Sequence, residues 1–180
     1  MSANPRTAMP AWRLAIWGGI LTALIMPWLL MRATGQGHWT AFDFIVWGLM
    51  LAVLGGGIEL ALRLSAHWSY RIAAAITLGG GFLMVWANLA VGIIGNEENP
   101  RNLLFHGVLL LGLLGAAATR FEARGLSRVL RAMAVLQVAV AVVAAALGWA
   151  LLPVFTLVFT GLWLVAGELF QRAAAPSDAG

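Results

Sequence analysis

The chain has 180 residues, of which 62% are hydrophobic and only 10% charged, and its mean hydropathy is +0.90. The net charge is +4 and there is no cysteine. A soluble domain of this length cannot bury so much apolar surface, and disordered chains or disulfide-stapled secreted domains have different compositions. The composition therefore indicates an integral membrane protein.

Six apolar stretches are long enough to cross a bilayer, which takes about 20 mostly apolar residues. They cover residues 14–31, 42–63, 71–94, 102–118, 128–147 and 151–170. Between the last two, Gly148 predicts a helix end and Pro153 predicts the first turn of the next helix. We therefore expect an all-α fold, with a single six-helix transmembrane domain over residues 14–170.

The first stretch follows Arg6 and Arg13, as the core of a signal peptide would. Its apolar part is longer than a usual signal core, and residues 31–35 form a poor cleavage site. We therefore interpret it as a retained helix that follows a cytoplasmic N-terminal segment at 1–13. Cleavage would leave the other spans with the same orientation.

The distribution of arginine predicts the orientation, because cytoplasmic loops of membrane proteins are enriched in basic residues. With the N-terminus in the cytoplasm, nine arginines lie on the cytoplasmic side and only Arg32 and Arg101 lie outside. Both termini are then cytoplasmic, and residues 171–180 form a disordered cytoplasmic tail. Because the arginines are spread over the loops, they indicate an anionic bilayer surface as their partner and not nucleic acid.

The loop between the third and fourth spans has a distinctive sequence. It reads VGIIGNEENP from Val91 to Pro100, and Asn102 and Leu103 follow. The stretch 91–121 resembles a family of small, uncharacterised bacterial inner-membrane proteins. The resemblance implies a multi-pass protein of the bacterial inner (plasma) membrane, and it implies no activity, cofactor or catalytic residue.

Polar side chains gather on the expected outer side. The 95–102 loop supplies Glu97 and Glu98, His106 lies one turn into the fourth span, and Asp43 lies at the start of the second. Imidazole and carboxylate groups suit a divalent metal or proton exchange. No pair has the spacing of a zinc site, so we assign no metal, no cofactor and no catalytic residue.

Local spacings in these loops favour structural roles instead. The expected caps are a helix C′ at Gly95, an N-cap and N1 pair at Asn99 and Pro100, and a capping box between Thr40 and Asp43. Glu97 is expected to pair with Arg101 in the turn. His106 lies near the depth of Asn88, so a hydrogen bond between the two helices would satisfy both side chains.

Three polar side chains lie inside the expected spans: Glu59, Asn88 and Gln137. Glu59 is the only charge more than four residues inside a span, and such carboxylates are costly and often functional. Arg63 lies four residues further on, where an ion pair within the helix would give Glu59 a structural role instead. Gln137 is expected to lie opposite Thr160 near the midplane and to bond to it.

Close packing of membrane helices relies on small residues. These recur at four-residue intervals in the second and third spans, at Gly48, Ala52 and Gly56 and at Ala73, Thr77 and Gly81.

No reaction motif is present, and three functional hypotheses stay open. The favoured one is a non-enzymatic accessory or interaction component that acts through its helix faces. Its partners would be the lipid bilayer and either further copies of the chain or another membrane protein. The second is a small transporter or channel that uses the intramembrane polar residues. The third is a membrane enzyme with a glutamate and histidine site on the periplasmic face.

Overall fold

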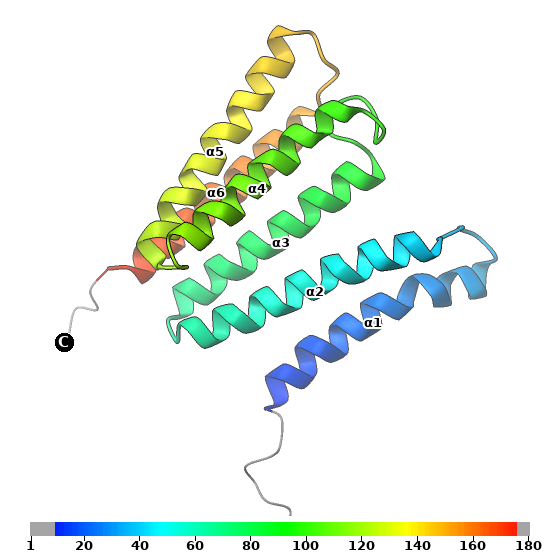
Figure 1. The fold of residues 1–180 in the computed structure, drawn as a ribbon, viewed down its shortest axis with the longest axis horizontal. Helices are drawn as coiled ribbons and strands as arrows, with labels where there is room; N and C mark the ends of the chain where they lie inside the picture. Colours follow the sequence, from blue (N-terminus) through cyan, green and yellow to red (C-terminus); the bar gives the residue numbers. More distant parts are fainter. Residues whose placement is uncertain (1–9, 176–180) are drawn as a thin grey trace, which may run out of the picture. The chain divides into compact units, whose positions relative to one another are not determined.

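The computed structural model describes residues 10–175, and the regular elements of this part are helices (Figure 1). They are α1 (Ala11–Thr34), α2 (Ala41–Leu64), α3 (Trp68–Ala90), the short 3-10 helix η1 (Pro100–Asn102), α4 (Leu103–Ala118), α5 (Ala123–Ala146) and α6 (Pro153–Ala173). Counting η1 with α4, six helices are long and apolar enough to cross a membrane. The all-α fold and the six candidate spans are therefore confirmed. Residues 1–9 of the expected N-terminal segment and 176–180 of the expected tail lie outside the described residues.

The helix α3 ends earlier than expected. It stops at Ala90 and not near residue 94, because Gly92 adopts a φ of 75° and donates its N–H to the carbonyl oxygen of Ala87 at 3.0 Å. A glycine with positive φ ends a helix at little cost. Gly95 also has a positive φ, 74°, but it lies in the following loop. Its expected role as a helix C′ is therefore wrong, and Gly92 takes that role.

The expected break between the last two spans is confirmed. The helix α5 ends at Ala146, Gly148 has a φ of 65°, and Pro153 occupies the first turn of α6. The helix α5 begins at Ala123 and not at 128. The apolar run predicted only the part of the helix that could lie in a bilayer, and the helix continues beyond that part.

The chain divides into two compact units, Met1–Leu60 and Ala61–Gly180. The first contains α1 and most of α2. Gly48 on α2 lies next to Leu24 on α1, and a Cβ added to Gly55 would overlap the side chain of Ile20. The two helices therefore approach closely where α2 has no side chain, although no residue of α1 is buried.

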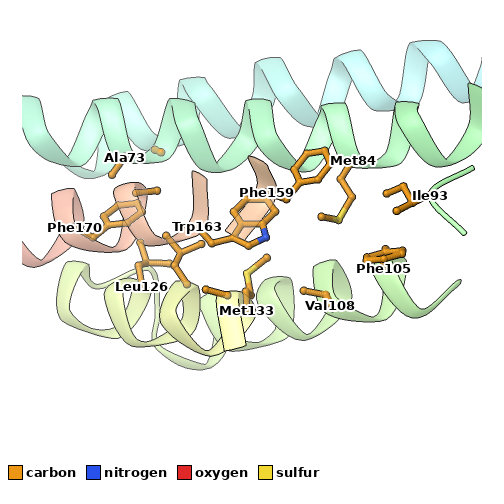
Figure 2. Packing of buried hydrophobic residues seen from close by; sticks show 14 of the residues in the cluster. Ala73, Met84, Ile93, Phe105, Val108, Leu126, Met133, Phe159, Trp163 and Phe170 are labelled. Atoms are coloured by element: carbon orange, nitrogen blue, oxygen red, sulfur yellow. The ribbon is translucent and has the colours of Figure 1, made fainter. Parts of the chain in front are cut away.

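The second unit contains a core formed by the last four long helices, in which α6 packs on both α5 and α3, and α4 packs on α5. Trp163 of α6 is fully buried and stacks on Phe159, with ring centroids 6.3 Å apart. Its ring lies against Gly80 of α3, where an added Cβ would come within 3.1 Å of the ring carbons. Figure 2 shows both aromatic residues within the buried cluster, whose labelled members also include Ala73, Met84, Ile93, Phe105, Val108, Leu126, Met133 and Phe170.

Tyr70 of α3 contacts both the α4–α5 turn and the end of α6. Its hydroxyl donates a hydrogen bond of 2.9 Å to the carbonyl oxygen of Phe121, in the turn between α4 and α5. Its ring meets Phe170 of α6 edge to face, with centroids 5.0 Å apart. The start of α3, the α4–α5 turn and the end of α6 are therefore joined through one side chain.

Candidate functional site

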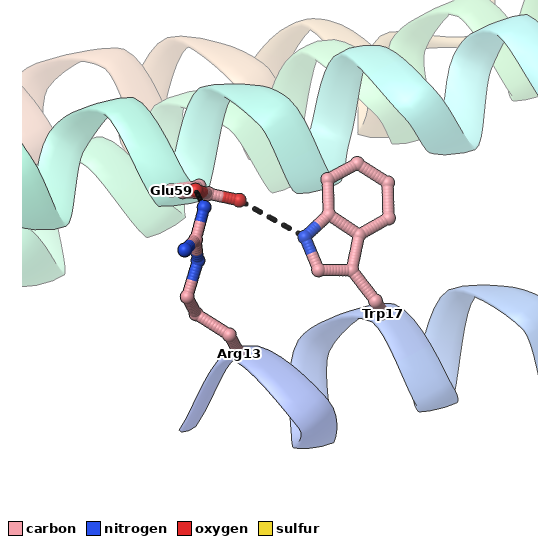
Figure 3. A network of polar contacts seen from close by, with 3 residues as sticks. All are labelled: Arg13, Trp17 and Glu59. Carbon is pink, nitrogen blue, oxygen red and sulfur yellow. Dashed lines mark hydrogen bonds and ion pairs between the residues drawn. The ribbon is translucent and has the colours of Figure 1, made fainter. Parts of the chain in front are cut away.

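A partly buried ion pair joins the two helices of the first unit. Glu59 on α2 is 8% exposed, and its carboxylate pairs with the guanidinium of Arg13 and accepts a hydrogen bond of 2.9 Å from the indole N–H of Trp17. Figure 3 shows Arg13 and Trp17 pointing from α1 toward Glu59. Because Arg13 and Trp17 are four residues apart on a helix, they share one face and can bind the same carboxylate.

This arrangement changes the interpretation of Glu59. The sequence suggested an ion pair within α2, with Arg63 one turn away, and the structure adds a cation and a donor from α1. Both oxygens of the carboxylate are bonded, which offsets part of the cost of burying it in an apolar hairpin. Sequence reasoning missed Arg13 and Trp17 as its partners, and their i, i+4 spacing at the start of the first span was the available signal.

A second polar contact joins the same two helices further along. Pro27 lies inside α1 and has no N–H, so the carbonyl oxygen of Ala23, four residues before it, loses its usual donor within the helix. The indole N–H of Trp47 on α2 donates to this oxygen at 3.0 Å. The α1–α2 hairpin is thus held at two levels, and a proline in mid-span was the sequence signal for the second.

Asn102 organises the loop between α3 and α4. Its side chain is 4% exposed, and its Oδ1 accepts hydrogen bonds from the N–H groups of Ile93 at 3.0 Å and Ile94 at 2.8 Å. Its Nδ2 donates to the carbonyl oxygen of Asn96 at 2.7 Å. Because α3 ends at Ala90, these backbone groups have no hydrogen-bond partner within a helix, and the Asn102 amide provides one. The sequence had placed Asn102 only at the start of a span.

The same loop is bonded to the link between α5 and α6. The N–H of Gly95 donates to the carbonyl oxygen of Ala150 at 2.7 Å, and Leu152 donates to Ile93 at 3.1 Å. We call residues 91–102 together with 148–152 the loop lid. The lid joins the ends of four helices, so it is a fixed part of the second unit.

Trp149 also belongs to the loop lid. The guanidinium of Arg101 lies over its ring, 4.5 Å from the centroid, which is a cation–π geometry. The structure gives Arg101 no ion pair with Glu97, so the expected pairing of these two residues is wrong. The half-buried ring of Trp149 orders the Arg101 guanidinium better than the exposed carboxylate of Glu97 would.

The other polar residues of the expected outer side lie as follows. Glu97 and Glu98 are exposed on the turn of the lid. His106 is half-buried, and its Nδ1 lies 3.2 Å from the carbonyl oxygen of Asn102 in the preceding turn. The structure therefore does not assemble Glu97, Glu98 and His106 around one point. Among residues 10–175, no three histidine, aspartate or glutamate side chains lie close enough to hold a metal ion.

Two of the expected helix caps are confirmed. Asp43 accepts a hydrogen bond of 2.6 Å from the N–H of Thr40, and the N–H of Asp43 bonds back to the Thr40 hydroxyl at 3.3 Å. This reciprocal arrangement is a capping box. Asn99 accepts a bond from the N–H of Arg101, and Pro100 takes the first helical position of η1. Asp43 therefore has a structural role at the start of α2.

Polar side chains in the core of the second unit keep unused hydrogen-bonding capacity. Asn88 is 3% exposed, and its Nδ2 donates to the carbonyl oxygen of Met84 at 2.8 Å. His106 lies against the carbonyl oxygen of Asn102 instead, so the expected bond between Asn88 and His106 is not formed. Gln137 is fully buried, and neither of its amide atoms has a hydrogen-bond partner in the described chain. The Thr160 hydroxyl also lacks one, so the expected bond between Gln137 and Thr160 is not formed. Further buried polar atoms of the described chain also lack a hydrogen-bond partner: Asn88 Oδ1, Ser127 Oγ, Thr156 Oγ1 and Trp163 Nε1.

The expected small-residue positions are only partly used for packing. Gly48 faces Leu24, whereas Ala52 is exposed and a Cβ added to Gly56 would meet no atom of a neighbouring element within 4 Å. In α3, Ala73 is fully buried, Gly81 lies near Leu109 of α4, and the Thr77 hydroxyl bonds to the Ala73 carbonyl oxygen within its own helix. The tightest approaches instead involve their neighbours, Gly55 and Gly80.

Comparisons of the chain with protein-family models, with curated proteins and with solved structures gave no match. The functional interpretation therefore depends on the geometry of the two units.

Proposed function

We propose that the chain is a multi-pass protein of the bacterial inner membrane with both termini in the cytoplasm. Six candidate spans agree with an even number of crossings. In this orientation the exposed Glu97–Glu98 turn of the loop lid lies outside, and the arginines of the α4–α5 turn lie inside. The resemblance of residues 91–121 to bacterial inner-membrane proteins supports the same location.

The orientation is tested with alkaline phosphatase, which is active only outside the cytoplasm. We expect a fusion after residue 98 to be active and a fusion after residue 123 to be inactive. Both fusions must be present in equal amounts in the membrane fraction for the comparison to hold. The reverse activities would overturn the orientation.

We further propose that the protein is a non-enzymatic interaction component and that α1 is its binding helix. The observation that carries this proposal is that no residue of α1 is buried, although the α1–α2 hairpin is held at two levels. Leu14, Leu21 and Ile25 are 48–57% exposed and share a helix face with Gly18, which has open space around it. A glycine on such a face permits close approach of a partner helix.

Photo-crosslinking tests this proposal. With a benzophenone amino acid at Leu21, we expect one recurrent adduct with a second polypeptide in intact membranes, and none from Leu113 of α4, which is 63% exposed. Gly18→Leu should abolish the adduct. The matched change Gly107→Leu should not, because Gly107 also has open space around it. Adducts only with lipid or within the same chain would overturn the proposal.

A second candidate function is transport of a small polar solute or ion. It is favoured by the buried polar atoms without partners in the second unit, above all those of Gln137. Unpaired amide groups in an apolar core are costly and need a compensating role or partner. Thr156, Thr160 and Gln137 come from the two helices α5 and α6, which pack directly on each other.

Replacing Gln137 by leucine separates the two functions. The side chains have similar volumes, and an unpaired amide is removed, so we expect the free energy of unfolding to stay the same or to rise by about 1 kcal/mol. An SDS titration in detergent micelles measures this change.

An interaction component should keep its α1 adduct in this variant, whereas a transporter should lose solute flux in proteoliposomes. A loss of several kcal/mol of stability would show that Gln137 is well bonded.

A further inference from the structure

Four side chains between α5 and α6 carry buried hydrogen-bonding groups that the chain leaves unpaired. They are Gln137 of α5 and Thr156, Thr160 and Trp163 of α6, and we call them the polar seam. Gln137 and Trp163 are fully buried, and Thr156 is 9% exposed. Within residues 10–175, nothing bonds to the amide atoms of Gln137, to the two threonine hydroxyls or to the indole nitrogen.

A contact between Gly167 and Leu130 shows how the two helices are aligned. They are antiparallel and packed on each other (Figure 1), and a Cβ added to Gly167 would lie 3.5 Å from the Cβ of Leu130. Gln137 lies seven residues after Leu130, and Thr160 lies seven residues before Gly167. Since seven residues make almost two helical turns, Gln137 and Thr160 lie at the same level on faces that are turned toward each other.

The hydroxyl of Thr160 is not used by its own helix. Thr22, Thr77 and Thr119 each donate to the carbonyl oxygen four residues earlier, at 2.8–2.9 Å. Such a bond is within reach of any threonine inside a helix. Thr160 does not form it, although Thr156 lies four residues earlier in α6. Its hydroxyl is therefore left for a group outside α6.

The polar seam needs an occupant that both donates and accepts hydrogen bonds. The N–H groups of Gln137 and Trp163 require acceptors, whereas the amide oxygen of Gln137 requires a donor. A metal cation cannot accept from the N–H groups, and a halide cannot donate to the amide oxygen. The seam contains no charged residue, so the charge of either ion would also be uncompensated. The occupant is therefore small and neutral, which water satisfies.

The spacing of the seam along α6 also suits water. Thr156, Thr160 and Trp163 follow one another at three or four residues, which is about 4.5–6 Å along a helix axis. Polar atoms so far apart cannot bond directly, but one water with two hydrogen bonds of about 2.8 Å joins them. A water takes only about 30 Å³, so a file of waters does not require a cavity of ligand size.

We propose that a file of ordered water molecules occupies the polar seam and bridges the Gln137 amide to Thr156, Thr160 and Trp163. Ordered waters are the usual partners of buried polar groups that a chain leaves unpaired. The site depends on neither the proposed membrane orientation nor a transport activity. Release of an ordered water returns its entropy, so the small change in stability expected for Gln137→Leu is compatible with a hydrated amide.

X-ray radiolysis of the full chain in detergent micelles tests the proposal. Radiolysis converts water to hydroxyl radicals, which oxidise buried side chains only where water is bound beside them. Phe159 stacks on Trp163 of the seam (Figure 2), whereas Phe170 packs on Tyr70, whose hydroxyl is already bonded. Both phenylalanines are buried, 3% and 2% exposed. By peptide mass spectrometry, we expect Phe159 to be oxidised several-fold faster than Phe170, and Trp163 to be oxidised as well.

Two threonine variants form a matched pair for this experiment. Thr160→Val keeps the volume of the side chain and removes a seam hydroxyl, so oxidation of Phe159 should fall several-fold. Thr77→Val removes a hydroxyl that bonds within its own helix and should leave oxidation of Phe159 unchanged. Gln137→Leu should act in the same direction as Thr160→Val. Phe170 reports on folding, because it is oxidised too in a variant that unfolds.

The following outcomes would overturn the proposal. Equal oxidation of Phe159 and Phe170 in the unmodified protein would show a dry seam in which Gln137 bonds directly to Thr160. Unchanged oxidation in both Thr160→Val and Gln137→Leu, or an equal fall in Thr77→Val, would show that the water is elsewhere. A polar compound released on denaturation at one molecule per chain would show that a solute, and not water, occupies the seam.

Discussion

Replacing Asn102 by leucine is expected to lower the free energy of unfolding by about 3–5 kcal/mol. The substitution keeps the volume of the side chain but removes the acceptor of the Ile93 and Ile94 N–H groups and the donor to Asn96. Ile93 and Ile94 are fully buried, so water cannot replace the lost bonds without opening the loop lid. An SDS titration in detergent micelles, followed by circular dichroism, measures the change.

Two further substitutions control this result. Asn96→Ala removes an exposed side chain and keeps the backbone oxygen to which Asn102 bonds. A change below about 0.5 kcal/mol in the free energy of unfolding is therefore expected. Asn102→Asp keeps an acceptor for the two N–H groups but loses the donor and buries a carboxylate, so it should also destabilise the protein. If Asn102→Leu were as stable as the unmodified protein, the lid would not depend on the amide.

Replacing Glu59 by leucine should destabilise the α1–α2 hairpin by about 3 kcal/mol, because it leaves the partly buried guanidinium of Arg13 without the carboxylate. The indole N–H of Trp17 loses its acceptor in the same step. Replacing Arg13 as well, with leucine, should restore much of the loss, since the uncompensated charge is then gone. The double-mutant cycle, measured by SDS titration, gives the coupling energy of the pair.

Glu168→Leu is the matched control for Glu59→Leu. Glu168 pairs with Arg131 at 3.6 Å and Arg172 at 3.3 Å, but its side chain is 53% exposed. Exposed pairs contribute at most about 1 kcal/mol, so the same substitution should have a small effect here. Equal effects at the two positions would contradict the assignment of a partly buried, stabilising ion pair in the hairpin.

The helices and their local caps could be predicted from the sequence because each depends on neighbouring residues. Uninterrupted apolar runs located the six long helices, and Gly148 with Pro153 located the break between the last two. The capping box of Thr40 and Asp43 also requires only residues three positions apart. The end of α3 was predicted less well, since the apolar run continues through Ile93 and Ile94 although their N–H groups bond to a side chain.

The polar contacts between distant segments could not be predicted in the same way. Spacing rules relate Glu59 to Arg63 on its own helix, but they do not show that the start of α1 brings Arg13 to the same place. His106 and Asn88 were expected to bond to each other. Each instead lies within hydrogen-bond distance of a carbonyl oxygen four residues earlier in its own chain segment. Such an acceptor is always within reach, whereas a partner on another helix requires the correct rotation of both helices.

The loop lid has a consequence for the order in which the protein is assembled. Gly95 and Ile93 belong to a segment that is synthesised before α4, but their partners Ala150 and Leu152 are synthesised only after α5. The first three helices can therefore be complete while the backbone groups of Ile93 and Gly95 still lack these hydrogen-bond partners. Closure of the lid is therefore a late event, possible only once synthesis has passed α5 and reached Leu152.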